Sequence, residues 1–348
     1  MTHHREASPP PEGKAVRPRR PTMSDVALHA GVSLKTVSRV VNREPRVNAH
    51  MVDRVLSSVS ELGFRRNDIA ATLRSSEVSG TIGLLIEEIA NPFYASIACV
   101  AAEIAAGRDT LLLMVSSEED PEREKAMLLT LCERRVDGLL VVPAGSDHSY
   151  LRREMNMGIP VVFLDRPPGH LQADTVLIDN EGGGIAAIQR MIETGHRRIA
   201  VLLDSPAIYT MRERLRGARM ALAAAGVPGG AALERYEVRT PGQAAAAVRE
   251  LLDQRNPPTG FFCLNNRITS GAIEELCRQR SDAALIGFDD FEFAHLMPRP
   301  FTVVAHDPRV LARAGTEQLF RRIGGDQSPP VRRVLPISLV ERGTASAT

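Results

Sequence analysis

The stretch TMSDVALHAGVSLKTVSRVVNREPRVN, residues 22–48, decides the fold of the N-terminal part of this chain. It predicts two short helices joined by a tight turn at Gly31, a position that favours glycine because the φ angle can be positive there. Thr22 can cap the first helix, with Asp25 three residues later as the acidic half of a capping box. Ser33 can cap the second helix. The spacing therefore predicts a helix-turn-helix, with the second helix poised for the major groove of DNA.

Apolar residues at helical spacing predict a small core of three helices. The third helix would begin at Asn48 and end at Gly63. The expected core positions, in chain order, are Val26, Ala27, Ala30, Val37, Val40, Val41, Val52, Val55, Leu56, Val59 and Leu62. A helix pair alone is also typical of larger domains without a DNA partner, but the third helix favours the DNA-binding interpretation.

The charge is distributed unevenly along the 348 residues, although the formal net charge is only +1. Residues 1–80 contain 13 Lys or Arg and 8 Asp or Glu, whereas the remainder contains 30 and 34. A basic headpiece before an acidic body is expected of a DNA-binding protein with a separate second function. We expect residues 1–20 to be a disordered basic tail that adds nonspecific attraction to phosphates.

Other classes of protein lack support in this sequence. No G-x-S-x-G elbow, P-loop or H-E-x-x-H motif is present, so we expect no catalytic residues, no cofactor and no enzyme activity. The cysteines show no metal-ligand spacing and are expected to be buried free thiols: Cys99, Cys132, Cys263 and Cys277. Without an apolar membrane span or signal-peptide core, we expect a cytoplasmic, nucleoid-associated protein with no membrane partner.

After Gly80, apolar runs alternate with helix-like stretches. Buried parallel strands with helical crossovers produce this alternation, and about 260 residues is too long for one small sheet. We therefore expect two doubly wound α/β subdomains with a ligand at the carboxyl ends of the strands. The expected strands are 81–86, 110–115, 138–142, 160–164, 199–203, 260–264 and 285–288, and the clearest helices are 123–135, 183–194 and 243–253.

The order of these motifs resembles the lac/gal repressor family of bacterial transcription factors. The resemblance implies a helix-turn-helix headpiece at 21–66, a hinge helix and linker at 67–80, and an effector-binding and dimerisation body at 81–343, before a tail at 344–348. The body is similar to periplasmic sugar-binding proteins, with two Rossmann-like lobes. Their expected ranges are about 81–178 plus 306–335 for one lobe, and about 179–305 for the other.

The resemblance also implies which residues bind DNA. Leu34 and Lys35 match the two positions that select bases, and Arg39 matches a third. Lysine can bond guanine O6 and N7, whereas leucine offers only apolar contact, for example with a thymine methyl group. Residues expected mostly to hold phosphates are Ser33, Thr36, Ser38, Asn42 and Asn48, and Thr22 is also expected to bind DNA. The alternative for Ser38 and Asn42 is that each is a solvated polar residue.

A hinge helix is implied after the headpiece. Ala70 and Leu73 match the positions at which paired hinge helices from two subunits enter the minor groove, with the leucine wedged between base pairs. The alternative is that Leu73 packs against the body. The wedge requires a homodimer and hence a palindromic operator.

The implied effector is a small polar molecule, a sugar or sugar acid, held between the lobes by convergent polar groups. By resemblance, Arg214 in the R-x-R-x-x-G element, Asn265 and Asp289 would contact it; strand-end Asp and Asn can also be ordinary helix caps. Further candidates are Phe93, Asp165 and His306. Asn266 stands where the family usually has Asp, and Arg239 raises the hypothesis of an anionic effector.

Two alternatives remain beside a sugar-controlled repressor. A transport-type sugar-binding protein would need the body alone, without a headpiece. A regulator that answers to a protein partner would need a site emptied of polar residues, whereas Arg214, Asn265 and Asp289 remain. Inducers and corepressors use the same architecture, so both signs of the response stay open.

Overall fold

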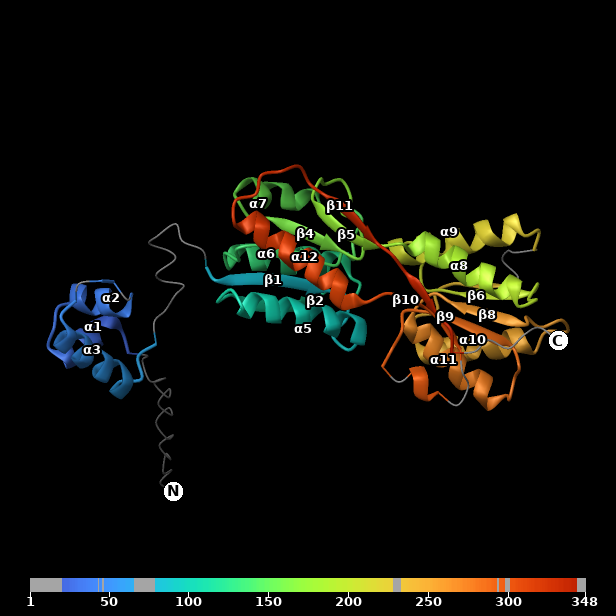
Figure 1. Ribbon diagram of the computed structural model, residues 1–348, viewed down its shortest axis with the longest axis horizontal. Helices are drawn as coiled ribbons and strands as arrows, with labels where there is room; N and C mark the ends of the chain where they lie inside the picture. The colour runs from blue at the N-terminus through green and yellow to red at the C-terminus, as the bar shows by residue number, and fades with distance from the viewer. Residues whose placement is uncertain are drawn as a thin grey trace, which may run out of the picture. The chain divides into compact units, whose positions relative to one another are not determined.

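The computed structural model describes residues 21–42, 44–45, 47–65, 79–227, 233–292, 294–297 and 301–342. The chain divides into two compact units, a helical headpiece and an α/β body that begins at Val78 (Figure 1). The expected tails at 1–20 and 344–348 and the expected hinge positions Ala70 and Leu73 lie outside the described residues.

The headpiece contains α1 (Met23–Ala30), α2 (Leu34–Val41) and α3 (Ala49–Glu61). The predicted capping box is confirmed, because the Thr22 hydroxyl accepts from the Asp25 N–H and the Asp25 carboxylate accepts from the Thr22 N–H at 2.7 Å. Gly31 ends α1 with a φ of +63°, the left-handed conformation that favours glycine. The predicted helix-turn-helix and third helix are therefore both present.

The headpiece core is smaller and slightly different from the predicted one. Val26, Val37 and Val55 are fully buried at its centre, where the three helices meet. The prediction for Leu56 is wrong, because this side chain is 52% exposed on the outer face of α3. Phe64 is buried against the cluster. Helical periodicity could not predict this, because Phe64 follows the end of α3.

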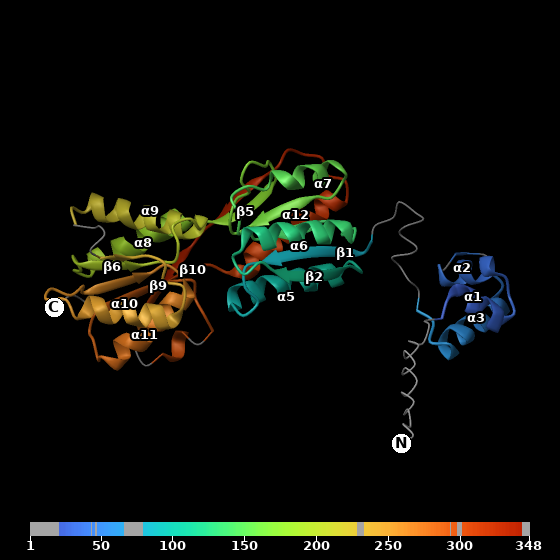
Figure 2. The same ribbon diagram turned by 180° about the vertical axis from the view of Figure 1, so that it is seen from behind.

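The first lobe of the body is a six-stranded parallel sheet in the order β11-β5-β4-β3-β1-β2. Helices α5 and α12 cover one face, and α6, α7 and the short turn η1 cover the other (Figures 1 and 2). The strands are β1 (Thr81–Ile86), β2 (Leu111–Ser116), β3 (Leu139–Val141), β4 (Val161–Leu164), β5 (Asp174–Ile178) and β11 (Arg332–Leu335). The helices are α5 (Pro92–Ala106), α6 (Pro121–Glu133), η1 (Ser149–Leu151), α7 (Arg152–Asn156) and α12 (Pro308–Ile323).

The second lobe has six strands in the order β12-β10-β9-β8-β6-β7, all parallel except the antiparallel pair β10 and β12. Helices α8 and α9 pack on one face, and α10 and α11 on the other. The strands are β6 (Ile199–Leu202), β7 (Glu234–Arg235), β8 (Gly260–Cys263), β9 (Ala284–Phe288), β10 (Thr302–Ala305) and β12 (Ser338–Val340). The helices are α8 (Asn180–Glu193), α9 (Tyr209–Ala224), α10 (Pro241–Leu252), α11 (Asn266–Arg278) and the turn η2 (Ala294–Leu296).

The chain passes between the lobes after β5, after β10 and after β11. Each strand and helix predicted within the described residues has a counterpart shifted by at most three residues at either end. Strand β12 was not among the predicted strands: after the last passage it returns to the second sheet and pairs with β10, although the range expected for the second lobe ended near residue 305.

The two faces of each sheet are both apolar, as parallel sheets covered by helices require. Ile82, Leu84 and Ile86 point toward α5 and α12, whereas Leu85 between them belongs to the opposite face, so side chains alternate along β1. The expectation of buried thiols is wrong for Cys99, which α5 exposes to solvent. Within the described ranges, no helix combines the length and apolarity that a membrane span requires.

Candidate DNA-binding face and ligand site

The first turn of α2 presents the side chains expected to select bases. Lys35 is exposed, and Leu34 is 51% exposed, so neither contributes to the headpiece core. The Ser33 hydroxyl accepts from the Thr36 N–H at 3.1 Å and lies 2.9 Å from the Thr36 hydroxyl. Asn48 accepts from the His50 N–H at 2.9 Å. Thr22, Ser33 and Asn48 thus all cap helices, as the sequence predicted for the starts of the three helices.

Arg39 lies on the same helix but is engaged within the headpiece. Its Nε donates to Glu44 Oε2 at 3.1 Å, and its Nη2 donates to the Pro45 carbonyl oxygen at 3.1 Å. Asn42 Nδ2 donates to Ser38 Oγ at 3.4 Å. Base contact by Arg39 therefore requires the guanidinium to leave Glu44, whereas Lys35 needs no such exchange.

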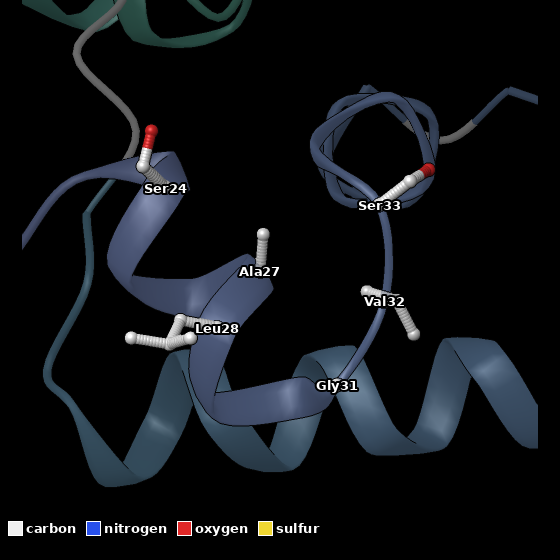
Figure 3. Close-up of a pocket in the computed structure, with 6 residues that line it drawn as sticks. All are labelled: Ser24, Ala27, Leu28, Gly31, Val32 and Ser33. Atoms are coloured by element: carbon white, nitrogen blue, oxygen red, sulfur yellow. The ribbon is translucent and has the colours of Figure 1, made fainter.

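A shallow hollow lies between α1 and the start of α2 (Figure 3). Ser24 lines it on one side and Ser33 on the other, and Ala27, Leu28, Gly31 and Val32 complete the lining. Leu28 is 87% exposed. Ser24 was not among the expected DNA-binding residues; its place in the first turn of α1 is the signal that could have pointed to it, because N–H groups in a first turn favour phosphate.

In the body, the two lobes are linked at the carboxyl ends of their strands, which we call the lobe junction. Asn266 Nδ2 donates to Asn91 Oδ1 at 3.0 Å, and Arg267 pairs with Glu88, each contact joining α11 or its start to the loop after β1. Asn266, the departure from the family's usual Asp, thus supplies an amide donor between the lobes. A carboxylate could not donate this bond.

Arg214 is fixed at the junction by a close contact between α8 and α9. A Cβ atom on Gly217 would lie 2.1 Å from the Glu181 carbonyl oxygen, and one on Gly184 would lie 2.2 Å from the Arg214 carbonyl oxygen. The two glycines therefore let the helix backbones touch. This contact brings Arg214 Nε within 2.8 Å of Asn180 Oδ1 and explains the glycine of the R-x-R-x-x-G element.

Arg214 is 3% exposed and bound on every side. It donates to the Leu264 carbonyl oxygen at 2.6 Å and to both Asp289 oxygens at 3.0 and 3.3 Å, and its guanidinium carbon lies 3.6 Å from the centre of the Phe288 ring. His306 Nε2 lies 3.2 Å from Asp289 Oδ1. Burial alone would raise the pKa of Asp289, but Arg214 and His306 outweigh it and hold the pKa below its ordinary value.

Asp165 and Asp289 occupy equivalent places in the two lobes, each directly after a strand and with a left-handed backbone, φ +66° and +68°. Asp165 is 3% exposed, and its Oδ1 has no partner among the described residues. Burial raises the pKa of Asp165, and the Asp289 carboxylate adds to the rise, while Arg166 and Arg214 oppose it. The two strand-end carboxylates therefore interact electrostatically across the junction.

The other two expected contacts differ in character. The Phe93 ring meets the His306 ring edge-on at 5.4 Å, so Phe93 is part of the junction. Asn265 Oδ1 accepts from the Ile268 N–H at 2.8 Å and caps α11, as the helix-cap alternative proposes. Its side-chain oxygen is therefore already engaged.

A buried charged cluster around Arg166 was not predicted. Its Nη1 donates to Glu119 at 2.5 Å and to the Pro143 carbonyl oxygen at 2.9 Å, and its Nη2 donates to Glu87 at 2.7 Å. The Tyr94 hydroxyl also donates to Glu87, at 2.6 Å. Burial raises the pKa of Glu119 to about 7, with Glu87 adding and Arg166 opposing. The sequence signal that could have pointed to this cluster is the acidic pair Glu118–Glu119, which follows β2.

Arg239 is paired with two carboxylates at the protein surface, where such pairs open readily. Its guanidinium is 2.5 Å from Glu237 Oε2 and 3.3 Å from Asp204 Oδ1. Among the described residues, no cluster of three or more His, Cys, Asp or Glu side chains has an arrangement that could hold a metal ion.

Comparisons with known proteins agree with this architecture. The family model "Bacterial regulatory proteins, lacI family" matches residues 22–67, and "Periplasmic binding protein-like domain" matches residues 188–345. The chain is 34% identical to the HTH-type transcriptional regulator CelR of Thermobifida fusca, over 94% of this chain and 98% of that protein. It is 31% identical to the ribose operon repressor of Escherichia coli K12, over 93% of this chain and 99% of the other.

Solved structures of transcriptional regulators have the same fold as this chain. The CelR–cellobiose complex superimposes with a TM-score of 0.68 at 31% identity, covering 94% of this chain and 100% of the other. The Lac repressor dimer bound to operator and the anti-inducer ONPF superimposes with a TM-score of 0.82 over the same shares, and at 24% identity it shows the fold alone.

A helix-turn-helix headpiece joined to a two-lobed body of the periplasmic-binding-protein type defines a class of DNA-binding transcriptional regulators rather than enzymes. This chain belongs to the lacI family of bacterial regulatory proteins.

The contact between α8 and α9 can be tested by Gly217→Ala. The added methyl group must push the helices apart, so we expect a loss of about 1–3 kcal/mol of stability and faster amide exchange in α8 and α9. Thermal unfolding and hydrogen exchange of the full chain measure both effects. Gly242→Ala in α10 is the matched control because its Cβ would meet nothing within 4 Å; equal stability of the two variants contradicts the close-contact argument.

The raised pKa of Glu119 predicts a pH dependence of stability. Between its ordinary value of 4.5 and about pH 7, the folded chain holds a proton that the unfolded chain has released, so stability falls as the pH rises through this window. Glu119→Gln keeps the group neutral and should flatten the fall in Tm between pH 5 and 7.5. Glu122→Gln, at an exposed position of α6, should keep the wild-type slope. An unchanged slope in Glu119→Gln rules out this assignment.

Proposed function

We propose that this protein represses transcription by binding a pseudo-palindromic operator as a homodimer, and that a small hydroxyl-rich effector bound at the lobe junction controls its operator affinity. The observation that carries the effector site is the convergence of Arg214, Asp289 and His306 on one side of the junction with Asp165 on the other. Sugars are recognised by such convergent carboxylate and guanidinium groups beside an aromatic wall. Phe93 would supply that wall.

We assign base selection to Leu34 and Lys35, with Arg39 contributing after its release from Glu44. Thr22, Ser33, Thr36, Ser38, Asn42 and Asn48 would contact phosphates and set the register, and Ser24 joins this set through the hollow that it shares with Ser33. Hinge contacts by Ala70 and Leu73 complete the proposal.

The edge of the first sheet supports the homodimer. Strand β2 pairs only with β1 in the first-lobe sheet, and its exposed side chains are apolar: Leu111 is 70% exposed, and Leu113 and Met114 are also exposed. An exposed apolar edge strand is a liability in a monomer, so a second subunit would cover it. The Lac repressor, which shares this fold, was solved as a dimer on its operator.

Operator binding can be tested by anisotropy of a labelled duplex taken from a pseudo-palindrome upstream of the protein's own reading frame. Lys35→Ala should weaken specific binding by about ten- to a hundredfold, because a lysine–guanine contact is worth about 1–3 kcal/mol. Lys125→Ala, on the exposed face of α6 in the body, should leave it unchanged. The absence of specific binding by the wild-type chain would overturn the proposed function.

The dimer can be tested by Leu113→Asp, which places a charge in the proposed interface. We expect sedimentation velocity to show monomers at concentrations where the wild type is a dimer. Because the dimer is lost, the operator affinity should also fall. Met157→Asp, another exposed apolar residue at the end of α7, is the control and should remain dimeric. A dimeric Leu113→Asp would place the interface elsewhere.

A further inference from the structure

Two pairs of carboxylates, each with one member from either lobe, interact electrostatically across the lobe junction. Asp289 of the second lobe adds to the rise in the pKa of Asp165 of the first. Burial raises the pKa of Asp204, which follows β6 of the second lobe, and Glu87, which follows β1 of the first, adds to that rise. Like charges at both places oppose the approach of the lobes unless a positive group lies between them.

The arginines of the junction are already engaged with carboxylates of the protein. Arg214 is bound by Asp289, Arg239 by Asp204 and Glu237, and Arg267 by Glu88. Arg166 is bound by both Glu87 and Glu119. Carboxylates outnumber guanidinium groups among these residues, and although Arg166 Nε is buried without a hydrogen-bond partner among the described residues, its charge is shared by several carboxylates. The junction therefore carries an excess of negative charge that a cationic group would offset.

Two buried carboxylate oxygens receive no hydrogen bond from the described part of the chain, and an effector could supply the donor. Asp165 Oδ1 and Glu119 Oε2 are both buried without a hydrogen-bond partner. Both carboxylates flank the same guanidinium: Glu119 Oε1 lies 2.5 Å from Arg166 Nη1, and Asp165 Oδ2 lies 3.7 Å from Arg166 Nε. One arginine cannot neutralise Glu87, Glu119 and Asp165 together. A buried, unpartnered carboxylate oxygen costs free energy that a charged donor recovers.

Resting on the proposed function of the junction as the effector site, we propose that the effector is an amino sugar whose protonated amine binds the Asp165 and Glu119 carboxylates. An ammonium group supplies three donors and no acceptor, which matches two carboxyl groups with unused oxygens. Its charge favours release of the proton that the raised pKa of Glu119 retains. The ring hydroxyls of the effector face Arg214 and Asp289. The ammonium also offsets the repulsion between Asp165 and Asp289, so its binding favours approach of the lobes.

The test is calorimetric titration of the full-length protein with matched sugars. The amines are glucosamine, galactosamine, mannosamine and the diamino analogue of cellobiose; the comparison compounds are the parent sugars, their N-acetyl derivatives and the corresponding uronic acids. We expect at least one amine to bind ten times or more tightly than its parent sugar. Acetylation should remove this preference because it removes the charge, and the uronic acids should bind most weakly.

Glu119→Gln separates the charge from the shape of the site. It should reduce the amine preference, measured as the ratio of the affinities for an amine and its parent sugar, at least tenfold, and Glu122→Gln should keep the wild-type ratio. Equal binding of a parent sugar and its amine, or tighter binding of a uronic acid, overturns the amino-sugar inference and leaves the proposed effector site standing. If operator binding is intact but no compound of any charge binds, the small-molecule effector and this inference both fail.

Discussion

The ion pair between Arg214 and Asp289 is the interaction on which the ligand-binding end of this protein depends. Both groups are largely removed from water, and the desolvation of a buried ion costs several kcal/mol unless its partners satisfy it. Here Asn180, the Leu264 carbonyl, the Phe288 ring and His306 complete the set. Removal of either partner alone leaves an uncompensated charge, so the pair constrains the ends of β8, β9 and α9 together.

Basic side chains differ in exposure and pairing between the headpiece and the body. In the headpiece, Lys35 is exposed and uncommitted, as a residue that meets DNA on arrival must be. In the body, Arg166 and Arg214 are buried and already bound to carboxylates of the protein, although Arg166 Nε has no hydrogen-bond partner within the described ranges. Arg39 lies between these extremes, because Glu44 holds it at the surface and the bond is solvent-accessible. Exposed pairs of this kind contribute little to stability and open readily.

Effector and operator binding must change each other's affinity by the same factor if both bias one conformational equilibrium. The lobe junction has the features of such an element: carboxylates that repel across it, and the Asn91–Asn266 and Glu88–Arg267 contacts that hold it together. A bound cation would weaken the repulsion between the carboxylates without breaking the Asn91–Asn266 and Glu88–Arg267 contacts. The sign of the transcriptional response depends on which arrangement suits the operator.

The sequence by itself determined the helices, the main strands and their order, because local patterns encode them: the capping box at Thr22, the left-handed turn at Gly31 and the apolar run 81–86 depend on neighbours within one or two turns of chain. It also singled out Arg214 and Asp289. Tertiary structure alone decided that Arg166 gathers Glu87 and Glu119, that Arg239 is already paired, that Asn265 caps a helix, and that β12 returns to the second sheet. Most of these contacts join residues 35 or more positions apart, and such pairs meet only through the chain's passages between strands and lobes, which leave no periodic signal in the sequence.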